Sequence, residues 1–110
     1  MNEPPERSGE CAAEEGPFRK GAVVRKLDIC NRKGLHARAS AKFVQTVEKY
    51  DADVRVMRCG ETVGGTSIMG LMMLAASPGT SITVEATGND AAAVIDALTA
   101  LINSRFGEDD

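Results

Sequence analysis

The sequence predicts an α+β fold, a four-stranded antiparallel sheet with three helices on one face, in the order βαββαβα. Apolar residues recur at every second position in four segments and at every third or fourth position in three others. The seven segments follow one another as two split β-α-β units do. With 110 residues, 43% of them apolar, the chain provides for one domain with one modest core. We therefore expect an open-faced sandwich.

The first predicted strand covers residues 22–30, where apolar and charged residues alternate around Leu27 and Ile29. A helix over residues 37–50 follows, because its apolar residues return at helical spacing. Its buried face is predicted to consist of Ala37, Ala41, Val44 and Val47, with Phe43 and Tyr50 on the flank.

Residues 54–57 and 61–63 predict two short strands that form a hairpin through the tight turn Cys59-Gly60. A second helix is predicted over residues 68–76, because Ser67 is a favoured N-cap and Ser77-Pro78-Gly79 ends the apolar run. A helix this short cannot bury its whole apolar circumference. Some of four apolar side chains should therefore remain exposed as a contact surface: Ile68, Met69, Met72 and Met73.

The fourth strand is predicted over residues 81–86, with Ile82, Val84 and Ala86 facing inward and Thr83 and Glu85 facing outward. The third helix follows, capped by Asn89 or Asp90. Its core residues are predicted to be Val94, Ile95, Leu98, Leu101, Ile102 and Phe106.

The charges and the few apolar residues of the chain ends define three regions. Residues 1–20, with three prolines and few apolar groups, are expected to be a disordered N-terminal tail. Residues 21–107 form the folded domain, and residues 108–110 form an acidic C-terminal tail. The formal net charge is −3, yet the domain has ten bases against eight acids, a balance that favours an acidic protein partner or a phosphate over nucleic acid.

The cysteines and the hydropathy exclude two classes of protein. Cys11, Cys30 and Cys59 have no spacing typical of a zinc site or of a disulfide framework, so we expect no metal. No apolar run approaches the roughly 20 residues that a membrane-spanning helix needs, and no signal peptide is evident. We therefore expect a cytoplasmic protein.

His36 is the only histidine, and it precedes the first predicted helix. The unpaired N–H groups and the dipole at a helix start favour an anion such as phosphate. The same positive field, with Arg38, Arg32, Lys33 and Lys42 nearby, disfavours an imidazolium. A neutral ring nitrogen is a nucleophile, and a guanidinium binds phosphate oxygens well. His36 and Arg38 are therefore the candidate site.

Two motifs resemble those of the HPr family, the histidine-containing phosphocarriers of the phosphoenolpyruvate-dependent phosphotransferase system. Gly34-Leu35-His36-Ala37-Arg38 is similar to the phosphorylation site, and Ser67-Ile68-Met69-Gly70-Leu71-Met72 is similar to the regulatory serine motif. The resemblance covers about residues 22–105. The family usually has proline after the arginine, whereas this chain has Ala39 and Ser40, and this difference points to the regulatory, nitrogen-related branch of the system.

The resemblance implies a cytoplasmic, monomeric carrier without a cofactor, rather than an enzyme. His36 would accept a phosphoryl group on Nδ1 from phosphorylated enzyme I, with help from Arg38, and pass it to an enzyme IIA-type protein. Ser67 would be phosphorylated by HPr kinase/phosphorylase, and Ile68, Met69 and Met72 would contact partners. The added charge on Ser67 would weaken docking without unfolding the helix.

Two other functions are compatible with parts of the sequence. The element order also resembles that of ferredoxin-like sensor domains, so a small-molecule-binding regulatory module without phosphotransfer is the main alternative. An independent hydrolase has less support, because the sequence offers no second base, carboxylate pair or metal site.

Overall fold

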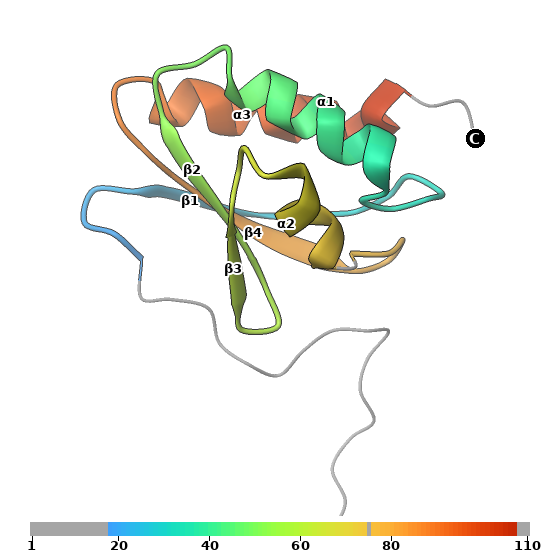
Figure 1. Cartoon of the computed structure of the whole chain (residues 1–110). Coiled ribbons are helices and arrows are strands. Elements are labelled where there is room, and N and C mark those ends of the chain that lie inside the picture. Colours follow the sequence, from blue (N-terminus) through green and yellow to red (C-terminus); the bar gives the residue numbers. More distant parts are fainter. Residues whose placement is uncertain (1–17, 75, 108–110) are drawn as a thin grey trace, which may run out of the picture.

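The computed structural model describes residues 18–74 and 76–107, and the predicted element order is confirmed (Figure 1). The elements are β1 (Val23–Asp28), α1 (Ala37–Val47), β2 (Asp53–Arg58), β3 (Glu61–Gly64), α2 (Ile68–Met73), β4 (Ser81–Thr87) and α3 (Ala91–Asn103). A short 3-10 turn, Arg105–Gly107, follows α3. The first two helices each end three residues earlier than predicted.

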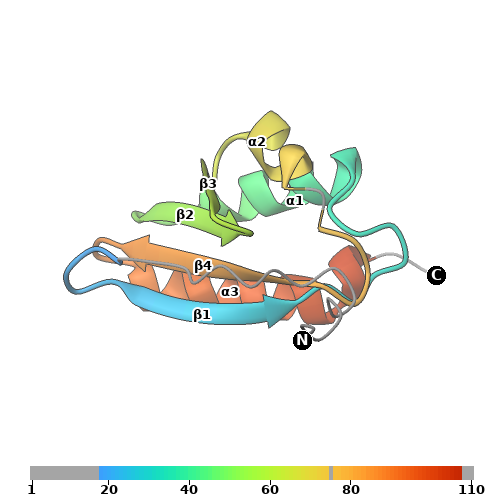
Figure 2. The same ribbon diagram turned by 90° about the horizontal axis from the view of Figure 1, so that it is seen from below.

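The four strands form one antiparallel sheet in the order β1-β4-β2-β3. Strand β4 lies between β1 and β2, and β2 lies between β4 and β3, so each β-α-β unit is split by a strand of the other. The helices cover one face, where α3 contacts β1 and β4 and α1 packs against both other helices (Figure 2). The open-faced sandwich expected from the sequence is confirmed.

The core lies between this face and the helices, but α1 is turned relative to the prediction. Ala37 is exposed and Ala41 is only half-buried, whereas Phe43 is completely buried. Burial of the largest side chain of the helix gains the most apolar area, which explains this orientation. The buried residues of α1 are Ala39, Ser40, Phe43, Val44 and Val47.

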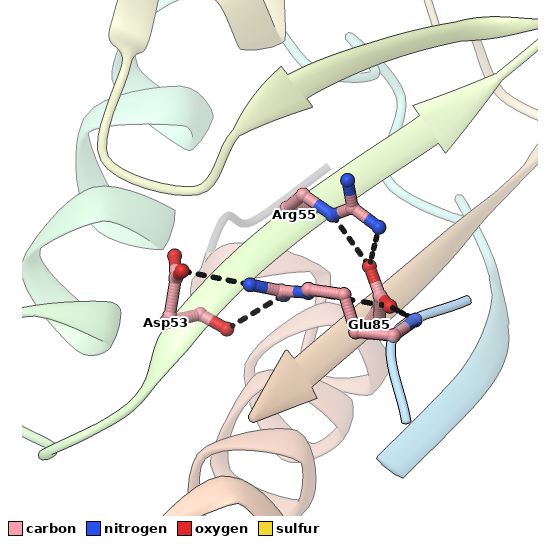
Figure 3. Close-up of polar contacts among 4 residues, drawn as sticks. Asp53, Arg55 and Glu85 are labelled. Carbon is pink, nitrogen blue, oxygen red and sulfur yellow. Dashed lines mark hydrogen bonds and ion pairs between the residues drawn. The ribbon is translucent and has the colours of Figure 1, made fainter. Parts of the chain in front are cut away.

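The helix-free face of the sheet contains a second departure from the prediction. Glu85 of β4 points to this face, as expected, but its side chain is buried. Its cross-strand neighbour Arg55 on β2 places Nε and Nη2 2.6 Å from Glu85 Oε1 (Figure 3). Glu85 therefore faces outward as predicted but is not exposed to solvent, because a guanidinium partner offsets the cost of burying the carboxylate.

Arg19 completes this ion-pair cluster from outside the sheet. Its Nε lies 3.3 Å from Glu85 Oε2, its backbone N–H donates to the same carboxylate, and its Nη1 lies 2.7 Å from Asp53 Oδ2. The sequence placed the boundary of the N-terminal tail at residue 20. Contacts with the sheet begin at least as early as Arg19. Residues 1–17 and 108–110 of the predicted tails lie outside the described residues.

Cys59 departs from the expectation of no disulfide, because it is disulfide-bonded. It shares a positive φ with Gly60, at 56° and 80°, in the turn between β2 and β3. Two successive positive φ values match the twist that a two-residue hairpin turn requires.

None of the helices in residues 18–74 and 76–107 is long and apolar enough to cross a membrane.

The Glu85 cluster makes stability depend on pH. Burial by itself would raise the pKa of the Glu85 carboxyl, but hydrogen bonds from Arg55 and Arg19 outweigh burial and hold that pKa below its ordinary value. A carboxyl whose pKa is lower in the folded state stabilises the fold above its unfolded pKa, about 4.3 for Glu, and this stabilisation disappears as the pH falls through the folded value.

We therefore predict that Glu85→Gln lowers the free energy of unfolding by about 2 kcal/mol at pH 7, an estimate kept small because both guanidiniums are partly exposed. The difference from the unmodified protein should shrink as the pH falls below the unfolded pKa of about 4.3 and through the lowered pKa of folded Glu85. Urea unfolding at several pH values measures it. Glu61→Gln, at an exposed position on β3, is the matched control. A loss of unfolding free energy in Glu85→Gln that is equal at pH 7 and at low pH would contradict the assignment.

Candidate functional site

The candidate site is built on the loop between β1 and α1. Strand β1 ends at Asp28, and the loop that follows turns at Gly34, where φ is +65°. The backbone N–H of Gly34 donates to the Asn31 carbonyl at 3.3 Å, and that of His36 donates to the Gly34 carbonyl at 2.9 Å. These two short-range bonds compact the loop and place His36 at the start of α1.

Gly34 also allows the loop to approach the segment that follows α2. A Cβ on Gly34 would lie 2.3 Å from the Ala76 carbonyl oxygen and 3.0 Å from Ser77 Cα. The same Ala76 oxygen accepts from the backbone N–H of Leu35 at 2.9 Å, and the Leu35 side chain is buried in the core. Only glycine fits this contact, which explains the residue at position 34.

His36 is the N-cap residue of α1, with extended backbone angles (φ −82°, ψ −175°). Its ring is partly exposed and makes no side-chain capping bond to the helix. The first helical hydrogen bond of α1 runs from Ser40 N–H to the His36 carbonyl at 2.9 Å. The backbone donors of residues 37–39 thus belong to the open first turn beside the imidazole, a place that favours an anion.

Asn31 is a site residue that sequence reasoning did not identify. Its side chain is completely buried, and its Nδ2 donates to the Gly34 carbonyl oxygen at 2.9 Å. The same oxygen lies 3.1 Å from Nδ1 of His36. The available signal was an asparagine in a turn three residues before a glycine, since such side chains commonly bond nearby backbone groups.

The cations expected around His36 divide into two kinds. Arg38 lies one residue into α1 and is exposed, as are Arg32 and Lys33 in the loop. Lys42 is instead half-buried and donates from Nζ to the carbonyl of Phe106 beyond α3. Lys42 therefore fixes the C-terminal turn against α1, and Arg38 is the exposed guanidinium at the helix start.

Ser67 caps α2 as predicted. Its Oγ accepts from the backbone N–H of Gly70 at 2.9 Å, and its carbonyl accepts from Leu71 N–H at 3.0 Å. A Cβ on Gly70 would lie 3.0 Å from both Ser67 Oγ and Val63 Cβ. Gly70 therefore lets the helix approach β3 while the cap stays in place.

The apolar circumference of α2 divides into a buried and an exposed side. Leu71 is completely buried, and Leu74, just after the helix, is only 3% exposed. The exposed side, named here the α2 apolar surface, consists of Ile68, Met69, Met72 and Met73, which are 40–70% exposed. Both ribbon views place α2 beside the start of α1, the helix that His36 caps (Figures 1 and 2).

Comparison with known proteins gives one consistent family. A family model described as the PTS HPr component phosphorylation site matches residues 23–104. A phosphocarrier protein HPr from Neisseria meningitidis serogroup A is 50% identical over 86 residues, which are 78% of this chain and 97% of the relative. A phosphocarrier protein NPr from Shewanella violacea is 37% identical over 78% of this chain and 94% of its own.

Solved structures agree in fold. HPr-C-His from Thermoanaerobacter tengcongensis superposes with a TM-score of 0.76 and 40% identity, over 80% of this chain and 99% of the other. An HPr dimer from the same organism superposes with a TM-score of 0.63 and 43% identity, over 74% of this chain and 94% of the other. The similarity therefore extends over nearly the whole length of each relative.

We predict that Gly34→Ala destabilises the protein more than its backbone angle alone requires. A Cβ at this position meets the Ala76 carbonyl in addition to the strain of a positive φ. Gly21→Ala is the matched control, because φ is +76° there and nothing lies within 4 Å of the added Cβ. The control should lose about 1 kcal/mol of unfolding free energy, and Gly34→Ala should lose clearly more in urea unfolding. Equal losses would contradict the close approach.

Proposed function

The chain belongs to the HPr family of phosphocarrier proteins of the phosphotransferase system, and we propose that His36 is the residue that carries the phosphoryl group. The observation that supports this most is the position of His36, a partly exposed imidazole at the open N-terminus of α1. A phosphoryl group on this ring would meet backbone donors and the positive end of the helix dipole.

Transfer would proceed by nucleophilic substitution at phosphorus. The lone pair of His36 Nδ1 forms the new N–P bond while the bond from phosphorus to the donor, phosphorylated enzyme I, breaks. The Arg38 guanidinium, one residue into the helix, would bind the phosphoryl oxygens and stabilise their charge. The reverse chemistry then delivers the group to an enzyme IIA-type protein, so the chain acts as a relay that its partners turn over.

The partners would dock over the α2 apolar surface beside His36. Exposed methionines adapt to differently shaped surfaces, which suits a carrier that must bind a donor and an acceptor in turn. We place the protein in the cytoplasm, where this system operates. We propose that the protein functions as a monomer. The similar HPr from Thermoanaerobacter tengcongensis is described as a dimer.

Ser67 is proposed as the regulatory site, modified by HPr kinase/phosphorylase. Its Oγ accepts a hydrogen bond from Gly70 N–H, a role that a phosphorylated oxygen retains. A phosphate adds a charge of about −1.5 to −2 at neutral pH next to the α2 apolar surface. The modification would therefore leave the helix capped and act on docking.

Membership of the family bears on two alternatives that the sequence left open: phosphotransfer against small-molecule binding, and an HPr-type carrier against the nitrogen-related branch. Membership of a phosphocarrier family favours phosphotransfer over the small-molecule-binding regulatory module, which has no use for His36. The difference at Ala39 pointed to the nitrogen-related branch. The higher identity to an HPr (50%) than to an NPr (37%) instead supports an HPr-type carrier.

The decisive experiment is incubation with enzyme I and phosphoenolpyruvate, followed by mass spectrometry. The protein should gain one phosphoryl group, His36→Ala should gain none, and Arg38→Ala should gain it more slowly. Arg25→Ala, which removes an exposed arginine on β1 paired with Asp96, is the control for loss of positive charge. Phosphate on His36→Ala, or none on the unmodified protein, would refute the proposal.

Ser67→Glu should weaken binding to enzyme I about three- to tenfold at low salt, because the added charge lies beside the docking surface. The effect should shrink at high salt, where such interactions are screened. Lys26→Gln is the matched control, since it changes the net charge equally from an exposed position on β1, at the opposite edge of the sheet from β3. Calorimetry at two salt concentrations measures both, and a loss independent of salt would count against a charge effect.

A further inference from the structure

The Gly34 carbonyl oxygen is shared by three nitrogen atoms. The His36 backbone N–H and the Asn31 Nδ2 each donate to it at 2.9 Å, and His36 Nδ1 lies 3.1 Å away. A carbonyl oxygen offers two lone pairs, so three donors must share them. The imidazole makes the longest of the three contacts, and its bond to this oxygen is therefore weakened by the other two donors.

This contact selects one form of the imidazole ring. A neutral imidazole has one nitrogen that donates and one that carries a lone pair. An Nδ1 lone pair facing a carbonyl lone pair at 3.1 Å would be repulsive, whereas an Nδ1–H group makes a hydrogen bond there. In this arrangement Nδ1 therefore carries the proton, and the lone pair is on Nε2.

We propose that the Gly34 carbonyl holds resting His36 in the Nδ1–H form, and that Asn31 keeps this hold weak by occupying the same oxygen. Asn31 is thus a positioning residue for phosphotransfer. The proposal rests on the proposed function in one respect, that Nδ1 receives the phosphoryl group. Because the atom that must attack is protonated at rest, the free protein is protected from accepting a group at Nδ1 until docking turns the ring.

The proton movements balance without a further reactant. As the ring turns away from Gly34, Nδ1 releases its proton to water and Nε2 takes one up, so the ring stays neutral. The exposed Nδ1 lone pair then forms the bond to phosphorus while the bond from phosphorus to the donor breaks. The phosphorylated Nδ1 cannot return to the Gly34 carbonyl, because it has no N–H to offer and its oxygens would meet the carbonyl oxygen.

The role assigned to Asn31 does not depend on its holding the loop together. Backbone bonds from Gly34 N–H to the Asn31 carbonyl, and from Leu35 N–H to the Ala76 carbonyl, fix the loop independently of the Asn31 side chain. Removal of Nδ2 should therefore leave the Gly34 oxygen in place with one donor fewer. The remaining contact with Nδ1 would then strengthen.

The first test is the ¹⁵N spectrum of the imidazole in the full chain, at a pH high enough for the ring to be neutral. His36 is the only histidine among 110 residues, so its two ring signals are unambiguous. We expect the chemical shift of a protonated nitrogen at Nδ1 and of an unprotonated one at Nε2. The opposite pattern, or an even mixture of the two forms, would overturn the proposal.

The second test is Asn31→Ala, with folding checked by circular dichroism. It should raise the Nδ1–H population and slow phosphorylation by enzyme I about two- to fivefold, the effect of strengthening one hydrogen bond by up to about 1 kcal/mol. Asn89→Ala is the matched control, because Asn89 Nδ2 bonds the Asp51 carboxylate at the start of α3. An unchanged or smaller Nδ1–H population in Asn31→Ala would refute the role of Asn31.

Asn31→Ser, which keeps a short polar side chain in the buried position, replaces the alanine variant if that variant does not fold. The ¹⁵N measurement requires no phosphoryl donor, so its outcome is independent of the proposed function. A protein that shows the Nδ1–H form yet never accepts phosphate from enzyme I would refute the carrier function alone. A protein that accepts phosphate but rests in the Nε2–H form would refute this inference alone.

Discussion

The backbone contact between Gly34-Leu35 and Ala76 is the constraint on which the arrangement of the site depends. Leu35 N–H donates to the Ala76 carbonyl, and Gly34 lies so close to the same oxygen that no side chain fits. This contact joins the loop that ends in His36 to the segment that follows α2. Two segments more than 30 residues apart in the sequence are therefore held together by a direct backbone contact.

Much of this fold could be predicted because local chemistry and packing agree along most of the chain. Ser67 has the residue type of an N-cap and is one, and the alternation of Ile82 and Val84 matches the face that they bury. The orientation of α1 could not be predicted from spacing alone. Two overlapping apolar faces were possible, and only the tertiary gain from burying Phe43 decides between them.

Glu85 and Asn31 were missed for a related reason. An acidic residue in an alternating strand normally faces water, and nothing local shows that Arg55 and Arg19 will neutralise Glu85 from positions 30 and 66 residues away. The histidine and its helix start could be found because they are neighbours in sequence. The buried amide that bonds the Gly34 carbonyl depends on how the loop closes, which emerges only in three dimensions.

The sheet separates the buried ion pairs of Glu85 from the proposed phosphorylation sites. The buried carboxylate lies on the helix-free face and joins β2, β4 and residue 19, whereas His36 and Ser67 lie at helix starts on the other side of the fold. A phosphate added at either helix start meets exposed groups and open backbone donors, not the core. The phosphorylation proposed for His36 and Ser67 would therefore add its negative charge without repacking the core.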